Sequence, residues 1–508
     1  MACSKILSGD LPELTYDIIK YLLDDFSTLH SCILVNRLWC RLAIPLLWEN
    51  PFSIPTKNYK FIEIYLLSLN DDFETKPSNT LFNYPSFLKY LNIWKFMICV
   101  EIWSRNAIRT LKPERYFIYD TYKYSKTEFM KLISISLFKI FIENEVTLHT
   151  LDIDISDHRY YCSYFNDIFE LILQNGTNFI HNIKNLKFCT STHSSFDNED
   201  MLLKNRISQI IDTHQNLKII LLCHNYLPLY QSLLLSKNSN CSNTLNTIMF
   251  YHINFGSIFN IDILFEQLNV LESVHIFFCY SLNSFIQKII NLPKPFKLKS
   301  LFINEKLRIE LLPLLLQKSG DYLENFECEL NYDEQRLLEL ITKYCKNIKF
   351  LDIYGFENHF TSLIFNLIEN IKQNLNYLSI GVDYQNGNIE SNSILLQNLG
   401  QILPPKLEYL NLVLYFKVND FKVFLRNSQG TFIKKLLINQ KGSDDILHCI
   451  KEFIMKEKRV KYLAIRNSND GELRRFENEA KEFELYNIKL QYYYAIFIYS
   501  YNYMKELY

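Results

Sequence analysis

The chain has 508 residues, of which 48% are hydrophobic and 21% are charged, and its formal net charge is −1. The apolar content can supply a buried core and excludes a disordered chain, and the near-zero charge indicates no preference for nucleic acid or acidic membranes. Glycine (11 residues) and proline (13 residues) are scarce, at about 5% together against about 12% on average, which excludes collagen-like repeats and long flexible linkers.

The sequence carries no evident targeting or membrane signal. Residues 1–5 are not followed by the apolar segment of a signal peptide, and no stretch approaches the roughly 18 apolar residues that span a bilayer. The 12 cysteines are scattered without a CxxC pair, and a chain of this length needs no disulfide bonds for stability. We therefore expect a cytoplasmic or nuclear protein, or one found in both compartments, with reduced cysteines.

The first predicted elements are three short helices within the first fifty residues. Pro12 suits the first turn of a helix, and apolar residues recur at helical spacing over 14–22. An acidic turn at 24–27 offers capping oxygens for a second helix, which is expected to carry the apolar residues of 29–39. Pro45 is expected to begin a third short element that ends at Trp48.

This helical segment contains three motifs in a fixed order, Leu11-Pro12, Val35-Asn36-Arg37-x-Trp39 and Leu46-Leu47-Trp48. In this order they resemble an F-box, which implies a helical domain at residues 8–53. The resemblance also implies binding to the Skp1 adaptor of a cullin-RING ubiquitin ligase. The residues that it assigns to this contact are Leu11, Pro12, Ile18, Leu22, Leu29, Val35, Trp39, Leu46 and Trp48.

A second interpretation of the helical segment stays open. Three generic helices that pack on the rest of the chain would show the same apolar spacing. The stretch Phe26–Leu29 also departs mildly from the F-box pattern at the entry to the second helix. The order of the three motifs favours the F-box interpretation.

The remainder of the chain contains an internal repeat. The pattern apolar-x-x-apolar-x-apolar occurs repeatedly, with the first occurrence centred on Leu151 and the last on Leu463. One occurrence alone means little in an apolar chain, but from Ile248 onward the central residues recur about every 27 residues. Before Ile248 the spacing between central residues is less regular. This period and pattern resemble leucine-rich repeats, in which each unit supplies one strand and one helix.

The two resemblances together imply an α/β fold, with a three-helix F-box followed by an irregular leucine-rich-repeat solenoid of about 26 residues per strand and helix. The solenoid is expected at 148–490, with a Tyr-rich C-terminal tail or cap at 491–508. Residues 54–147 form an intermediate segment. The repeat pattern recurs there at 88–93, which allows a first repeat with an insertion at 94–146.

Alternate residues of each predicted strand should form columns on the exposed concave face of the sheet. The first column is Thr150, Asn185, Ile219, Thr247, Ser273, Ser300, Asn325, Phe350, Tyr377, Tyr409, Lys435 and Tyr462. Stacked aromatic rings with polar tips are typical of binding hot spots, so Phe350, Tyr377, Tyr409 and Tyr462 are predicted to bind a target protein. The alternative is an even scatter of aromatic residues, because the chain has 34 Tyr and 38 Phe. A second column includes Met249, His275, Phe302, Glu327 and Asp352.

Catalytic and cofactor motifs are absent from the sequence. It contains no GxxxxGK[ST] or GxGxxG phosphate loop and no GxSxG nucleophile motif. The pairs Cys189/His193 and Cys223/His224 lack a second pair at zinc-ligand spacing. Asp152 is expected on a solvated strand face. We expect neither an enzyme nor a metal or cofactor site.

The predicted function is that of a substrate-recognition adaptor in a Skp1–cullin–F-box ubiquitin ligase. The F-box would dock on a Skp1-like adaptor and its cullin complex, and the repeat array would recruit an unknown protein substrate for ubiquitination. No nucleic-acid or membrane partner is expected. The alternative is a non-ligase leucine-rich-repeat scaffold or binding protein, whose N-terminal helices cap the solenoid as terminal repeats require.

Overall fold

The computed structural model describes residues 12–23, 25–54, 59–67, 81–111, 119–155, 162–175, 177–190, 205–206, 209, 216–223, 241–257, 261–305, 307–308, 310–330, 335–355, 360–382, 389–440, 446–455, 459–467, 471–472, 477–500 and 503. The chain forms two compact units, Met1–Asn246 with Gln267–Val270 and Thr247–Glu266 with Leu271–Tyr508, and each is described by itself. Within these ranges no helix has both the length and the apolar character needed to cross a membrane.

The first unit begins with the three expected helices. They are α2 (Pro12–Lys20), α3 (Phe26–Cys32) and α4 (Arg37–Trp48). The carboxylate of Asp25 caps α3 by accepting a hydrogen bond from the N–H of Thr28 at 3.1 Å, as the acidic turn predicts. The helices close around a small apolar core of Ile19, Leu29, Cys32, Ala43 and Leu46.

The boundary between the second and third helices differs from the prediction. The side-chain oxygen of Asn36 accepts a hydrogen bond from the N–H of Trp39 at 2.9 Å, so Asn36 caps α4 and Trp39 belongs to the third helix. Pro45 lies inside α4. Proline lacks an N–H and forgoes one helical hydrogen bond, but the helix continues through it. The expectation that Pro45 begins a new helix is wrong.

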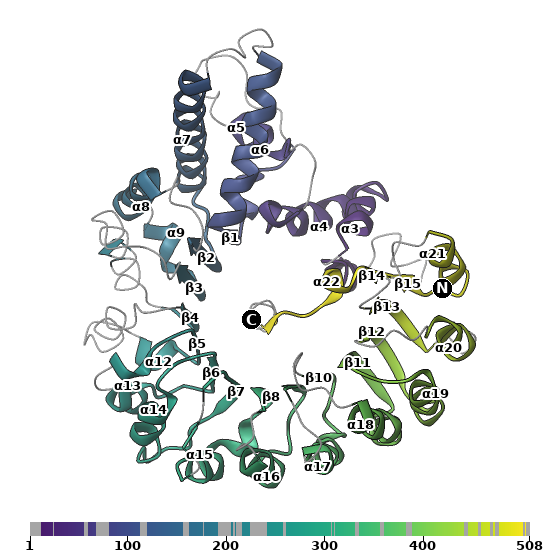
Figure 1. The fold of residues 1–508 in the computed structure, drawn as a ribbon. Helices are drawn as coiled ribbons and strands as arrows, with labels where there is room; N and C mark the ends of the chain where they lie inside the picture. The colour runs from purple at the N-terminus through teal and green to yellow at the C-terminus, as the bar shows by residue number, and fades with distance from the viewer. Residues whose placement is uncertain are drawn as a thin grey trace, which may run out of the picture. The chain divides into compact units, whose positions relative to one another are not determined.

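The rest of the first unit alternates helices with parallel strands. Its elements are η1 (Pro51–Ser53), α5 (Phe61–Leu66), η3 (Pro85–Phe87), β1 (Tyr90–Asn92), α6 (Ile93–Leu111), α7 (Tyr119–Glu143), β2 (Thr150–Ile155), α8 (Cys162–Asn175), α9 (Thr177–His181), β3 (Asn185–Thr190), β4 (Ile219–Cys223) and α12 (Cys241–Thr244). Strands β1 to β4 pair in chain order. The long helices α6 and α7 stand side by side and follow β1 in the chain (Figure 1). The central residue of the repeat pattern at 88–93, Leu91, therefore lies in a strand, whereas Ile93 begins α6, and a helical pair separates this strand from the next one.

The end of α4 closes the free edge of β1. The backbone carbonyl of Glu49 accepts hydrogen bonds from the N–H groups of Lys89 and Tyr90, both at 3.0 Å. The carbonyl of Lys89 in turn accepts from the N–H groups of His149 and Thr150 in the next repeat. Glu49 therefore takes the place of a preceding strand, and the N-terminal helices cap this end of the sheet.

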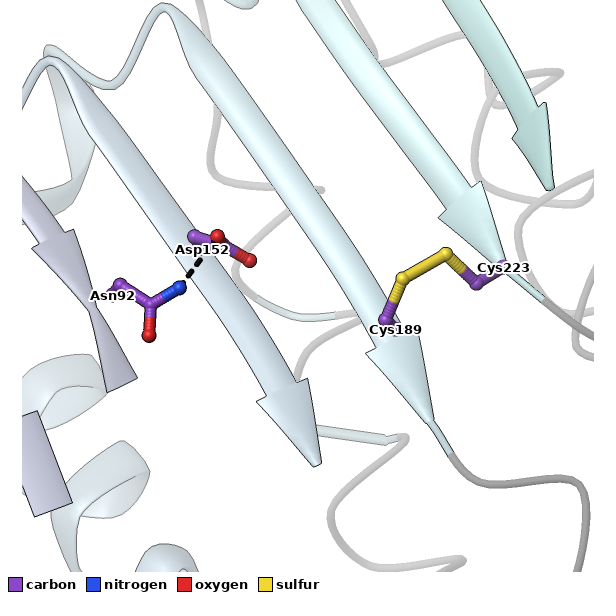
Figure 2. The surroundings of a disulfide bond; sticks show 4 residues. All are labelled: Asn92, Asp152, Cys189 and Cys223. Carbon is purple, nitrogen blue, oxygen red and sulfur yellow. Dashed lines mark hydrogen bonds between the residues drawn. A yellow bond between two sulfur atoms is a disulfide. The ribbon is translucent and has the colours of Figure 1, made fainter. Parts of the chain in front are cut away.

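Two cysteines form a disulfide bond at the ends of neighbouring strands. Cys189 on β3 and Cys223 on β4 are 34 residues apart in the sequence, and their Cα atoms are 4.8 Å apart (Figure 2). The expectation of reduced cysteines is wrong for this pair. The repeat pattern held a signal for it that the sequence analysis did not use, because each cysteine directly follows the last apolar residue of its pattern and Phe188 lies opposite Leu222. The neighbouring His193 and His224 lie outside the described residues.

Asp152 on β2 has a polar partner on the adjacent strand. The prediction placed it on a solvated face, but its side chain is half-buried. The Asn92 side-chain N–H donates a hydrogen bond to the Asp152 carboxylate at 2.6 Å, as Figure 2 shows. This contact joins β1 to β2 in addition to their backbone hydrogen bonds.

The second unit repeats strand and helix more regularly. Its strands are β5 (Thr247–Tyr251), β6 (Ser273–Phe277), β7 (Leu298–Ile303), β8 (Asn325–Glu329), β9 (Phe350–Tyr354), β10 (Tyr377–Gly381), β11 (Lys406–Leu414), β12 (Phe432–Gln440), β13 (Val460–Asn467), β14 (Gly471–Glu472) and β15 (Lys489–Leu490). Its helical segments are η5 (Phe255–Ser257), α13 (Ile261–Gln267), α14 (Leu282–Ile289), α15 (Leu312–Ser319), η6 (Gly320–Tyr322), α16 (Gln335–Tyr344), α17 (Thr361–Ile371), α18 (Ile389–Ile402), α19 (Val418–Asn427), α20 (Leu447–Ile450), η8 (Lys451–Met455), α21 (Glu477–Glu484) and α22 (Tyr493–Ile496). The strands line the inner side of an arc and helices α13 to α20 its outer side (Figure 1).

The predicted α/β repeat fold is confirmed. The central and last apolar residues of every repeat pattern lie in the strands β2 to β13 and are buried. Equivalent residues such as Leu351, Leu378 and Leu410 lie opposite one another in parallel register. Helices connect successive strands on the outer side, as parallel strands require.

The register is irregular between β6 and β7. It shifts after Val274, so that Ser300 lies opposite His275 and not opposite Ser273, as the predicted column requires. The side chains of His275 and Ser300 form a buried hydrogen bond of 2.7 Å. Burial also lowers the pKa of His275 to about 3, which keeps the imidazole neutral.

Candidate functional site

The residues predicted to contact an adaptor protein differ widely in exposure. Leu11 lies outside the described residues. Three others are buried within the first unit, namely Leu29, Leu46 and Trp48. Another three are half-buried, namely Pro12, Leu22 and Trp39. The buried side chains hold the helices together and are not presented to a partner.

Apolar side chains are exposed on α2, just after it, and in the turn between α3 and α4. Ile18 and Val35, which the sequence assigned to partner binding, are 38% and 49% exposed. Sequence reasoning missed Leu14, Tyr21 and Leu34, which are 45%, 90% and 80% exposed. Leu14 and Ile18 are four residues apart on α2 and share a face. Helical periodicity separated core from surface poorly here, because apolar residues occupy both sides of this short helix.

Side chains of β8 to β12 form two columns on the inner face of the second unit. The first column is Asn325, Phe350, Tyr377, Tyr409 and Lys435. The second is Glu327, Asp352, Ser379, Asn411 and Leu437. The ring of Tyr377 lies 6.0 Å from that of Phe350 and 6.2 Å from that of Tyr409. Lys435 separates these three aromatic residues from Tyr462 on β13.

The C-terminal segment lies across these two columns. Strand β15 pairs with β13, and the chain then turns through α22 towards Tyr503. In Figure 1 this segment runs inside the arc of strands. Side-chain hydroxyls and one backbone N–H fasten it to the face. The bonds, with the donor first, are Tyr493 Oη to Asn411 Oδ1 (2.7 Å), Ile498 N to Tyr409 Oη (3.4 Å), Ser500 Oγ to Glu327 Oε2 (2.5 Å) and Tyr503 Oη to Asn325 Oδ1 (2.9 Å).

The C-terminal segment contacts three of the four aromatic residues that were predicted to bind a target, Phe350, Tyr377 and Tyr409. The ring of Tyr503 stacks on Phe350 with centroids 4.4 Å apart. Tyr493 packs into a cluster with Tyr409. Phe350 and Tyr409 are each only 2% exposed as a result, whereas Tyr377 and Tyr462 are half-buried. The sequence identified a Tyr-rich tail or cap, but composition gave no signal for where it docks.

A cavity of about 490 Å³ lies between the C-terminal segment and strands β8 to β11. Phe497 and Tyr499 from the segment and Tyr354 from β9 form part of its wall. Glu327 and Asp352, neighbours in the second column, also line it. Ser379 and Asn411 on the next two strands continue this polar wall, and the sequence analysis did not single out either residue. The cavity is therefore rich in hydrogen-bond acceptors.

Burial raises the pKa values of both carboxyl groups in this cavity. Loss of hydration raises the pKa of Glu327 to about 8, and the nearby Asp352 carboxylate adds to the rise. Burial raises the pKa of Asp352 to about 7, opposed by a hydrogen bond from Ser379. Two adjacent buried carboxyl groups are costly to ionise together, so at neutral pH the pair holds a proton.

We expect the Glu327→Gln variant to be more stable than the wild type at alkaline pH. A carboxyl with a raised pKa binds more protons in the folded state, so stability falls as pH rises from the unfolded pKa through the folded one. Glutamine carries no such penalty and can still accept the hydrogen bond of Ser500. The gain at about pH 8.5 should be at least about 1.4 kcal/mol, the free energy of one unit of pKa, and should vanish near about pH 3.5, below the unfolded pKa. Urea unfolding at both pH values measures it, and an equal difference at both would contradict the prediction.

Comparisons with known proteins add little to this description. No protein-family model matches the chain, and no curated protein matches it. Among solved structures, the yeast complex of Rad7 and Elc1 resembles it with a TM-score of 0.36 and 14% sequence identity, over 68% of this chain and 77% of the other. A likeness this distant carries no argument about function. The fold is a repeat solenoid of parallel strands and helices, and residues 493–500 and Tyr503 lie on the inner face of the second unit.

Proposed function

We propose that the chain is the substrate-recognition subunit of a Skp1–cullin–F-box type ubiquitin ligase in the cytoplasm or nucleus. Its N-terminal helices bind a Skp1-like adaptor, and its repeat array holds a protein target near the ubiquitin-conjugating enzyme. The chain itself contributes no bond chemistry and no cofactor. Its effect on the reaction is proximity, because holding two reactants together raises their effective concentration.

The observation that carries this proposal is the exposed apolar surface of the N-terminal helices. Leu14, Ile18, Tyr21, Leu34 and Val35 lie within the segment that resembles an F-box, and all five are at least 38% exposed. Leu14, Ile18 and Tyr21 recur at helical spacing, and large apolar side chains exposed on one helix face are typical of protein-binding sites. The helices have their own core, so the exposed residues are available to a partner.

Co-purification with a Skp1-like adaptor tests the proposal. The wild-type chain should capture the adaptor, and Ile18→Glu should weaken binding at least about tenfold, because it places a charge in an apolar contact. Leu132→Glu is the matched control, since Leu132 on α7 is 60% exposed but lies outside the F-box-like segment. Circular dichroism should show the same fold for both variants. Failure of the wild type to capture the adaptor would remove the proposal.

A second candidate function is a scaffold or binding protein that acts without a ligase. The observation that favours it is the contact of Glu49 with β1, in which the N-terminal helices cap the sheet. A cap is sufficient reason for these helices to exist, because the terminal units of a solenoid need one. Under this candidate, adaptor binding is absent and Ile18→Glu has no effect on partner capture.

A further inference from the structure

We propose that the inner face of β8 to β13 is a groove for a peptide segment that presents tyrosine and serine hydroxyls. The chain's own C-terminal segment occupies this groove, and a target segment of the same chemistry displaces it. This inference rests on the proposed role of the repeat array as the target-binding part of the chain.

The acceptors on the face define the chemistry of the occupant. Asn325 and Glu327 on β8 and Asn411 on β11 each accept a hydrogen bond from a side-chain hydroxyl. Two of these hydroxyls belong to tyrosine and one to serine. Such acceptors reject a phenylalanine at the same place, because a buried acceptor without a partner costs about 1–3 kcal/mol.

Aromatic residues of the groove also contact the rings of the two bound tyrosines. Phe350 stacks face to face with the ring of Tyr503, while the hydroxyl of the same tyrosine reaches Asn325. At the other end of the groove, the Tyr493 ring packs with Tyr409 and its hydroxyl reaches Asn411. Each end of the groove therefore holds a tyrosine by its ring and its hydroxyl together.

The C-terminal segment bridges the groove without filling it. A pocket of about 490 Å³, open to solvent, remains between residues 497–500 and strands β8 to β11. Tyr492 and Tyr494 are 49% and 52% exposed, and Tyr499, which lines this cavity, is 47% exposed. The segment is held at separated points, as expected of an occupant that another segment can replace.

An occupant on the same chain competes strongly with one in solution. A tethered segment acts at an effective concentration of about millimolar, so a free peptide binds weakly until the tethered segment is loosened. The test therefore weakens the C-terminal segment and leaves the groove intact.

The probe is a fluorescein-labelled synthetic peptide of residues 489–508, and fluorescence anisotropy measures its binding to the full-length chain. The Tyr493→Ala/Tyr503→Ala variant should bind the peptide at least about tenfold more tightly than the wild type, because its own segment has lost both anchors. A peptide with phenylalanine at both tyrosine positions should bind this variant about fivefold or more weakly, since two hydrogen bonds are lost.

Further variants separate a failure to fold from a change in peptide binding. If the double alanine variant does not fold, Tyr493→Phe/Tyr503→Phe keeps both rings and should still bind the peptide about threefold more tightly than the wild type. Asn325→Ala/Asn411→Ala added to the releasing variant should remove the gain. Equal affinity of the wild type and the folded releasing variant would overturn the inference. Adaptor capture through the N-terminal helices is a separate measurement, so either proposal can fail alone.

Discussion

Trp48→Ala is expected to lower the free energy of unfolding of the first unit by about 3–5 kcal/mol. The Trp48 side chain is 9% exposed, and its ring centroid lies 4.4 Å from that of Tyr84, 5.1 Å from that of Tyr65 and 6.3 Å from that of Phe61. Alanine removes these contacts and leaves a cavity that rigid neighbours fill poorly. Urea unfolding followed by circular dichroism measures the loss.

The matched control for Trp48→Ala is Leu34→Ala. Leu34 lies in the same helical segment but is 80% exposed, so its replacement should change stability by less than about 0.5 kcal/mol. A loss below about 1 kcal/mol for Trp48→Ala would contradict the prediction. Because Trp48 directly precedes Glu49, the expected loss also measures how far the N-terminal helices support the edge of the sheet.

Gly400→Ala is expected to destabilise the second unit by up to about 2 kcal/mol in net terms. Gly400 lies in α18, where a Cβ atom would come 2.7 Å from the carbonyl oxygen of Phe424 and 2.9 Å from the Cβ of Asn427 on α19. These atoms belong to the neighbouring helix and its backbone, so α19 would have to move. Alanine favours the helix by about 1 kcal/mol, which offsets part of an overpacking cost of about 1–3 kcal/mol.

Gly430→Ala is the control for this substitution. A Cβ atom at Gly430 would meet no atom within 4 Å, so the change should stay within about 0.5 kcal/mol. Thermal unfolding of both variants beside the wild type gives the comparison. Equal midpoints for Gly400→Ala and Gly430→Ala would show that α18 and α19 can separate at little cost.

The strands could be predicted because each repeat obeys a local rule. Residues such as Leu351 and Ile353 must both point into the core, and this requirement leaves the same pattern in every unit. The three N-terminal helices followed equally from local signals, including the acidic cap at Asp25. Two local signals competed for the start of the third helix. The Asn36 cap set the start of α4, and Pro45 lies inside this helix.

The covering of the inner face could not be predicted from local patterns. Tyr493 and Tyr503 find partners 82 and 178 residues away in the sequence. Such contacts depend on where the whole sheet places its side chains. The shifted register at Val274 could not be predicted for the same reason, because it is a property of a pair of strands.

The lengths of the strands bear on self-association. Strands β11 and β12 have nine residues each, but β1 has three and β14 and β15 have two each. An open strand edge is a template on which another chain can add a strand, and the risk grows with the number of unpaired N–H and C=O groups. Strands this short offer a second copy almost no ladder to extend. The long parallel strands β11 and β12 lie in the interior of the described sheet and do not form its edges.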